Sequence, residues 1–266
     1  MVTSPLYSFS NSILMQSLKS FFRLLPILLG LLFAHTYTLA DEIYIAVASN
    51  FAGAMKTLVN EFEGSTEHRV ILIPGSTGKH YAQIVNGAPF DLFFAADKKR
   101  PELLEVQGLV EPNSRFTYAI GKLVLWSPLD DYIDADGSVV DGGDYHYLAI
   151  ANPKLAPYGR AAKEVIESRG LWAALQSKLV RGENIAQAHQ FVASGNASLG
   201  FVALSQIVKS SKVIKGSYWK VPEELYSPIE QQAVLLKNSD VAREFLTYLK
   251  SDVAKAIIQG FGYGVP

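Results

Sequence analysis

The chain has 266 residues, of which 49% are hydrophobic, so its length allows one or two domains with a substantial core. The 24 basic and 25 acidic residues give a formal net charge of −1, which excludes the basic excess typical of nucleic-acid-binding proteins. Cysteine is absent, so the chain forms no disulfide and has no cysteine to carry an N-terminal lipid.

Residues 1–40 have the composition of a secretory signal peptide. Two basic residues precede the apolar run 24–33, which is too short for a comfortable membrane span, and Ala40 is a small residue at the expected cleavage point. Met1 and Met15 are both possible starts, and an uncleaved N-terminal anchor is the alternative to a cleaved signal. We therefore expect cleavage near Ala40 and a mature protein that is soluble in the periplasm.

Alternating strand and helix patterns run through the first part of the mature chain. Apolar runs alternate with stretches whose apolar residues recur at helical spacing, for example Met55, Leu58 and Phe62. The expected strands are 43–48, 69–73 and 90–95, and the expected helices are 51–63, one that includes 81–85, and 98–107. Ser49 or Asn50 is expected to cap the first helix. This alternation predicts a mostly parallel sheet that is covered on both faces.

A second series of strands and helices follows a strand-like stretch at 116–126 and a polar loop at 130–144. Its expected strands are 147–151, 199–203 and 232–236, its expected helices include 161–166, 172–175, 184–195, 240–250 and 251–259, and residues 216–228 are expected to be irregular. Two similar α/β halves predict two lobes with a cleft between them. We assign residues 41–120 and 232–266 to the first lobe and residues 121–231 to the second.

Small polar residues stand at the ends of two predicted strands in the first half, at Ser49-Asn50 and at Ser76-Thr77-Gly78. In the second half, Pro157-Tyr158-Gly159 and Asn184-Ile185 open two further predicted helices. The start of a helix presents free backbone N–H groups and the positive end of the helix dipole, which together favour an anion. Ligands of open α/β sheets lie beyond the carboxyl ends of the strands, so four such junctions facing one cleft predict a cage of N–H groups. The alternative for each junction alone is a capped helix without a ligand.

Other site chemistries have weaker support. Residues 75–79 (GSTGK) suggest a nucleotide phosphate loop, but Ile73 and His80 stand where that motif requires glycine and a hydroxyl residue. The five histidines include no pair at metal-ligand spacing. Asp91 and Asp97 flank an apolar strand and are interpreted as cap or turn residues rather than as an acid and a base. No serine, histidine and aspartate arrangement has the context of a nucleophile elbow, so no catalytic residue is predicted.

Six short segments together resemble the periplasmic molybdate-binding proteins that feed ABC transporters. They are 47–51 (VASNF), 75–78 (GSTG), 83–89 (QIVNGAP), 91–97 (DLFFAAD), 156–159 (APYG) and 199–202 (LGFV). The similarity covers nearly all of residues 43–266. It implies an α/β type II periplasmic-binding-protein fold, in which two lobes are joined by two hinge strands with the ligand cleft between them. It also implies a dehydrated tetrahedral oxyanion held by neutral hydrogen-bond donors.

The resemblance further implies which residues hold the oxyanion. The implied donors are Ser49, Asn50 and Thr77 in the first lobe, with Ser76 as a secondary candidate, and Tyr158 and the backbone N–H of Ile185 in the second lobe. Many relatives have a ligand-binding tyrosine where this chain has Ala203. In one branch of the family a tyrosine in the Pro-Tyr-Gly turn takes that place, so we expect Tyr158 to supply the donor that is missing at Ala203.

These inferences lead to one expected function and two alternatives. The expected function is a high-affinity receptor for molybdate and tungstate that delivers its ligand to an ABC permease, acts as a monomer, needs no cofactor and catalyses no reaction. Neutral donors select by the size of the cage and by protonation, because a cage of donors suits an unprotonated anion. The alternatives are a receptor for sulfate or another tetrahedral oxyanion and, with less support, a hydrolase that uses the same cleft.

Overall fold

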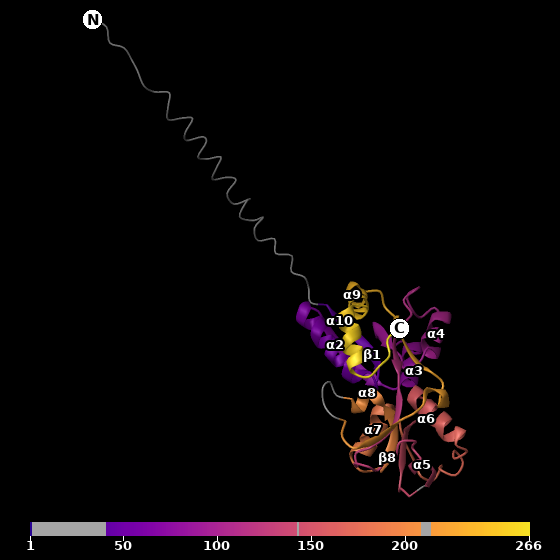
Figure 1. Cartoon of the computed structure of the whole chain (residues 1–266). Helices are drawn as coiled ribbons and strands as arrows, with labels where there is room; N and C mark the ends of the chain where they lie inside the picture. The colour runs from indigo at the N-terminus through magenta and orange to yellow at the C-terminus, as the bar shows by residue number, and fades with distance from the viewer. Residues whose placement is uncertain (2–40, 143, 209–213) are drawn as a thin grey trace. The chain divides into compact units, whose positions relative to one another are not determined.

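The computed structural model describes Met1 and residues 41–266, except residue 143 and residues 209–213 (Figure 1). The predicted signal peptide therefore lies outside the described residues, apart from Met1. Among the residues that are described, no helix is long and apolar enough to cross a membrane.

The first of two five-stranded sheets has the strand order β2-β1-β3-β10-β4. Strand β1 (Glu42–Ala48) pairs in parallel with β2 (Arg69–Gly75) and with β3 (Leu92–Phe94), which is the central strand. Strand β10 (Ile229–Leu235) runs antiparallel to β3 and to β4 (Phe116–Gly121). The sheet is therefore mixed rather than mostly parallel, because β10, which returns from the second sheet, runs against the other four strands.

The second sheet has the strand order β7-β6-β8-β5-β9. Strand β6 (Leu148–Ala151) pairs in parallel with β7 (Leu179–Gly182) and β8 (Leu199–Ala203). Strand β5 (Leu123–Ser127) runs antiparallel to β8 and to β9 (Ser217–Lys220). The stretch 116–126, which the sequence presents as continuous strand, is thus two strands that belong to different sheets and are separated by Lys122.

Helices accompany both sheets, which confirms the predicted α/β architecture (Figure 1). The helices next to strands of the first sheet in the chain are α2 (Ala52–Ser65), α3 (Thr77–Val85), α4 (Lys99–Val106), α9 (Asp240–Leu249) and α10 (Asp252–Gly260). Those next to strands of the second sheet are α5 (Val139–Gly142), α6 (Pro157–Ser168), α7 (Ile185–Ala193) and α8 (Leu204–Ile207), with a 3-10 turn at Glu223–Leu225.

Each sheet has its own hydrophobic core. On the first sheet, Met55, Leu58 and Phe62 of α2 pack with strand residues such as Ile45 and with α9. Their spacing places them on one face of the helix, which is why the sequence pattern predicted it. Burying a side chain of this size contributes roughly 1.5–3 kcal/mol to folding. The second sheet has a separate cluster centred on β5, β6 and α6.

Several local predictions were wrong. Residues 172–175 form turns rather than a short helix, with isolated bonds such as Leu175 N–H to the Leu171 carbonyl at 3.0 Å. Residues 216–228 contain β9 and a 3-10 turn rather than irregular structure, and β7 and α8 were not predicted. These elements have three or four residues each, too few to show a clear hydrophobic period, and the strands among them form by pairing with a neighbour in the sheet.

Candidate functional site

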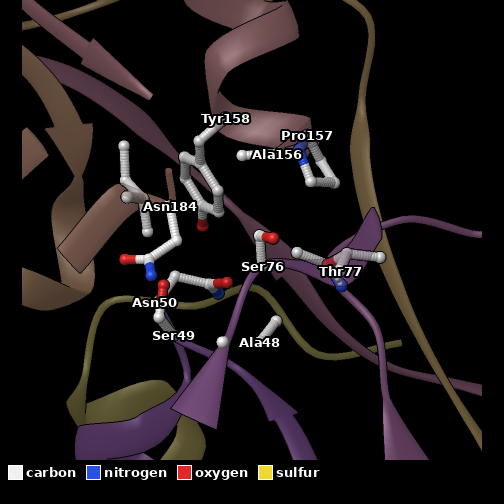
Figure 2. Close-up of a pocket in the computed structure, with 12 residues that line it drawn as sticks. Ala48, Ser49, Asn50, Ser76, Thr77, Ala156, Pro157, Tyr158 and Asn184 are labelled. Atoms are coloured by element: carbon white, nitrogen blue, oxygen red, sulfur yellow. Dashed lines mark hydrogen bonds between the residues drawn. The ribbon is translucent and has the colours of Figure 1, made fainter. Parts of the chain in front are cut away.

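A small cavity lies where β1, β2, α6 and α7 meet (Figure 2). Its volume is about 10 Å³, far below the roughly 300–1,000 Å³ of pockets for drug-sized ligands, so a small ion suits it better than an organic metabolite. The residues that line it are Ala48, Ser49, Asn50, Gly75, Ser76, Thr77, Ala96, Ala156, Pro157, Tyr158, Asn184 and Ile185. All six predicted oxyanion-binding residues are in this set, from elements of both sheets. None of these lining residues carries a charge.

The first wall is the turn after β1. The backbone N–H of Ser49 donates to the Gly75 carbonyl at 2.9 Å, and its hydroxyl oxygen accepts from the Ala186 N–H at 3.4 Å. The hydroxyl proton therefore remains available for another acceptor. The prediction that Ser49 or Asn50 caps the first helix is wrong: the N-cap of α2 is Phe51, with no side-chain cap, because the turn places one more residue before the helix.

The side-chain amide of Asn50 is engaged in hydrogen bonds with other residues and is not free to bind a ligand. Its Nδ2 donates to Gln231 Oε1 at 2.8 Å and to Tyr263 Oη at 3.0 Å, so both amide N–H bonds are used. The Tyr263 hydroxyl in turn donates to the Asn50 carbonyl at 2.8 Å. These bonds hold the turn rigidly, and they leave the backbone N–H as the group through which Asn50 can reach an anion.

The second wall is the start of α3. Ser76 is the N-cap, and its hydroxyl oxygen accepts from the Lys79 N–H at 3.4 Å. Thr77 is the first helical residue, so its N–H has no carbonyl one turn earlier to bond. The Thr77 hydroxyl oxygen accepts from the Ala96 N–H at 3.0 Å and keeps its proton for donation. Both residues are buried, which removes competing water.

The third wall comes from α6 and α7. Pro157 opens α6, and Tyr158 follows it with only 1% of its surface exposed. Figure 2 shows the Tyr158 hydroxyl pointing into the space between Asn50 and Ser76. Burial raises the pKa of Tyr158 well above its ordinary value, so the phenol stays protonated and can donate. Asn184 caps α7 by accepting from the Gln187 N–H at 3.0 Å, which leaves the N–H of Ile185 at the first position of the helix.

The cavity favours an anion although no cationic side chain lines it among the described residues. Three helices, α3, α6 and α7, begin at its wall and direct their positive dipole ends towards it. Each helix start contributes on the order of 0.3–1 kcal/mol, and about 2 when partly buried. A buried anion is costly unless it is fully hydrogen-bonded, and here hydroxyl and N–H donors can supply those bonds.

The two aspartates considered above have structural partners. Asp91 accepts from the Tyr44 N–H at 2.7 Å, and Asp97 accepts from the Arg100 N–H at 3.1 Å and forms ion pairs with Arg100 and Arg160. Neither lines the cavity. Among the residues that the structure describes, no group of three or more histidines, cysteines or carboxylates could hold a metal ion.

Ala203 is the N-cap of α8, where its N–H donates to Gln206 Oε1 at 2.9 Å. It is buried but does not line the cavity, whereas Tyr158 does. The structure thus brings the tyrosine of the Pro-Tyr-Gly turn into the set of lining residues.

Three residues behind the cavity escaped the sequence analysis. Gln231 accepts from Asn50 and from the Tyr118 hydroxyl, and Tyr263 holds the Asn50 backbone. The one signal was the polar run Glu230-Gln231-Gln232 inside a strand that is otherwise apolar. Nothing in the sequence indicated that it meets Asn50, 181 positions earlier.

Comparison with known proteins gives a consistent set of relatives. The family described as bacterial extracellular solute-binding protein matches residues 43–264. The molybdate-binding protein ModA of Azotobacter vinelandii is 52% identical over 229 residues, covering 85% of this chain and 91% of the relative. The molybdate-binding protein ModA of Rhodobacter capsulatus is 44% identical, covering 84% and 88%. The solved structure of the Azotobacter vinelandii periplasmic molybdate-binding protein matches with a TM-score of 0.82 at 45% identity, covering 84% of this chain and 99% of that one.

Proposed function

Because the chain belongs to the bacterial extracellular solute-binding proteins and to the ModA molybdate-binding proteins, we propose that it is a molybdate receptor that supplies an ABC permease. The observation that carries this proposal is the cavity itself. Neutral donors from elements of both sheets surround a space suited to one small anion, and no charged side chain lines it. The protein binds and releases its ligand and catalyses no reaction; molybdate is its ligand and not a cofactor.

We assign the oxyanion contacts as follows. The donors are the hydroxyls of Ser49, Thr77 and Tyr158 and the backbone N–H groups of Asn50, Thr77 and Ile185, with the Ser76 backbone as a secondary donor. Tyr158 supplies the contact for which Ala203 has no side chain. The bonds that engage the Asn50 amide and the Ser49 N–H support this division between side chains and backbone.

This donor set explains selectivity by size and protonation. Tungstate has the same charge and tetrahedral shape as molybdate, so the site should accept both. Sulfate is smaller and would leave donors without a partner, which costs about 1–3 kcal/mol for each buried group left unsatisfied. A protonated oxyanion would bring an O–H group into a cage of donors, where it has no acceptor. A sulfate receptor is the second candidate, because neutral donors do not distinguish these anions by charge.

Ligand release requires the cavity to open. We propose that residues 41–120 with 232–266 form one lobe and residues 121–231 the other, with hinges near 116–122 and 229–233. The passage of the chain between sheets at β4–β5 and β9–β10 supports these positions. Closure of the lobes on the ligand would present to the permease a form that differs from the empty one. The receptor is proposed to act as a monomer.

The proposed location is the periplasm, after removal of the signal peptide near Ala40. The basic residues, apolar run and small residue in 1–40 support this. N-terminal sequencing of the protein isolated from periplasm should begin at Asp41. A mature protein that keeps the apolar run 24–33 would show that it is an anchor.

Thermal unfolding in the presence of oxyanions tests the function. Only the folded cavity assembles the donors, so molybdate at one hundred times its Kd should raise stability by about 2.7 kcal/mol. Tungstate should act similarly, and the same concentration of sulfate or phosphate should shift Tm much less. Equal shifts with molybdate and sulfate would favour the second candidate, and no shift with molybdate would reject the proposal.

A further inference from the structure

Gln231 occupies a position that touches both sheets behind the cavity. It lies on β10, is fully buried, and stands where the pairing of β10 with β4 shifts register between Gln231 and Gln232. Its side-chain amide bonds to three side chains. Asn50 follows β1 and Tyr118 lies on β4, both in the first sheet, whereas Tyr158 lies in the first turn of α6 next to the second sheet. Asn50 and Tyr158 both line the cavity, and Gln231 does not.

Two hydrogen bonds to its oxygen determine the orientation of the Gln231 amide. Its Oε1 accepts from Asn50 Nδ2 at 2.8 Å and from the Tyr118 hydroxyl at 3.0 Å. With two donors directed at the oxygen, the amide presents its NH₂ group towards Tyr158, and Nε2 donates to Tyr158 Oη at 3.3 Å. Gly121 makes this approach possible, because a Cβ there would lie 2.3 Å from Tyr158 Oη and 2.8 Å from Gln231 Nε2.

The consequence falls on the Tyr158 hydroxyl. A phenol has one O–H donor, and its oxygen can also accept a hydrogen bond. The Gln231 amide donates to the Tyr158 oxygen, so the Tyr158 O–H must donate to a different acceptor. Figure 2 shows that the hydroxyl points into the space between Asn50 and Ser76, where the proposed oxyanion would lie.

We propose that Gln231 is a positioning residue that fixes Tyr158 as a hydrogen-bond donor to the bound oxyanion. This rests on the proposed function, since it assigns how one donor of that site is oriented. Without the Gln231 amide, the Tyr158 hydroxyl is free to rotate, and part of its binding contribution is lost in restoring the donating orientation. Gln231 acts through Tyr158, so its effect on affinity depends on the presence of the Tyr158 hydroxyl.

A double-mutant cycle tests this dependence. Calorimetry would measure oxyanion affinity for the wild type, Gln231→Met, Tyr158→Phe and the double variant. Gln231→Met keeps the side-chain length and removes the amide, so we expect about a tenfold loss of affinity in the wild-type background. In the Tyr158→Phe background the same change should cost no more than about twofold. A purely structural role would give the same fold loss in both backgrounds and would overturn the proposal, as would an unchanged affinity.

Gln232→Met is the matched control, because Gln232 is the neighbouring buried glutamine but bonds to Arg115 and Thr117 instead. Its affinity should stay at the wild-type value. Should Gln231→Met fail to fold, the wild-type protein still tests the idea through carbon-13 NMR at tyrosine Cζ, with Tyr158→Phe used to assign the resonance. Donation to an anion should move the Tyr158 resonance on ligand addition, and an unmoved resonance would overturn the proposal.

The oxyanion panel separates this inference from the proposed function. The affinities of the four proteins are measured for whichever of molybdate, tungstate and sulfate the wild type binds. Binding of sulfate alone would reject the molybdate function while leaving the coupling of Gln231 and Tyr158 to be decided by the cycle. Molybdate binding with no coupling would reject the role of Gln231 alone, and failure to bind any of the three would reject both.

Discussion

The backbone N–H of Gly78 in α3 donates to the carbonyl oxygen of Leu155 at 2.9 Å, and so joins a helix of the first sheet directly to the loop before α6. Beside it, Lys79 and Glu183 form an ion pair with 3.2 Å between Nζ and Oε1. The approach is so close that a Cβ on Gly78 would lie 2.9 Å from the Leu155 oxygen and 3.1 Å from its Cα. A side chain at this position therefore conflicts with the observed approach of α3 to the loop before α6.

Gly78→Ala should weaken oxyanion binding without destabilising the ligand-free protein. The new methyl group must push backbone atoms apart when the cavity closes, at a cost of about 1–3 kcal/mol, so affinity should fall about tenfold or more. Alanine is the better helix former by about 1 kcal/mol, which should maintain the stability of the open form. Calorimetric titration together with ligand-free melts would measure both effects.

Gly64→Ala is the control for that substitution. Gly64 also lies in a helix, α2, but a Cβ there would meet nothing within 4 Å. Its affinity should match the wild type. A Gly78→Ala variant with the same affinity as Gly64→Ala would show that closure does not require this contact.

Tyr158→Phe removes one hydroxyl and very little volume. A hydrogen bond to a charged group contributes roughly 1.5–3 kcal/mol, so molybdate affinity should fall about tenfold to a hundredfold or slightly more. The ligand-free Tm should change little, since the buried ring keeps its packing in the core of the second sheet and the bond lost from Gln231 Nε2 is long, at 3.3 Å. Wild-type affinity in this variant would mean that a different group replaces the side chain missing at Ala203.

Ser49→Ala and Ser76→Ala should separate binding from helix capping. Ser49 is not a helix cap, so its loss should lower affinity and leave the ligand-free Tm close to that of the wild type. Ser76 is the N-cap of α3 and is assigned only a backbone contact, which alanine keeps, so its replacement should lower ligand-free stability by about 1 kcal/mol and change affinity little. Equal ligand-free melts for the two variants would contradict this distinction.

Protonation of His80 should lower the stability of the folded protein in mild acid. Burial lowers the pKa of this ring below its ordinary value, although a hydrogen bond with Gln83 opposes the change. Its Nε2 has no hydrogen-bond partner among the described residues and packs close to Gly75. Above the pKa of the unfolded state, about 6.5, the ring is neutral in both states. Below it, the ring is protonated in the unfolded chain but remains neutral in the folded protein, so protonation favours unfolding. Stability is therefore complete at neutral pH and is lost as the pH falls through the folded pKa.

The measurement is a comparison of melts of the wild type and His80→Gln between about pH 7.5 and about pH 5.5. The variant cannot titrate at this position, so its Tm should decline less over that interval. Parallel declines in the two proteins would show that other groups cause the acid sensitivity.

The sequence predicted the parts of the fold that depend on local patterns. The helical period of Met55, Leu58 and Phe62 and the apolar run of β1 were sufficient to find α2 and β1, and the polar junctions pointed to residues that do line one cavity. It did not reveal β7 or β9, whose four-residue segments form through pairing with β6 and β5. Gln231 was missed for a related reason, because it meets Asn50 and Tyr158 only when distant segments fold together.

The most direct test of this account is a crystal structure of the protein with tungstate, since tungsten can be located by its own anomalous scattering. We expect one tungsten atom in the cavity, with oxygens about 2.5–3.2 Å from the hydroxyls of Ser49, Thr77 and Tyr158 and from backbone N–H groups at the starts of α3 and α7. A tungsten atom held by lysine or arginine side chains elsewhere on the protein, with the cavity closed and without the anion, would contradict it.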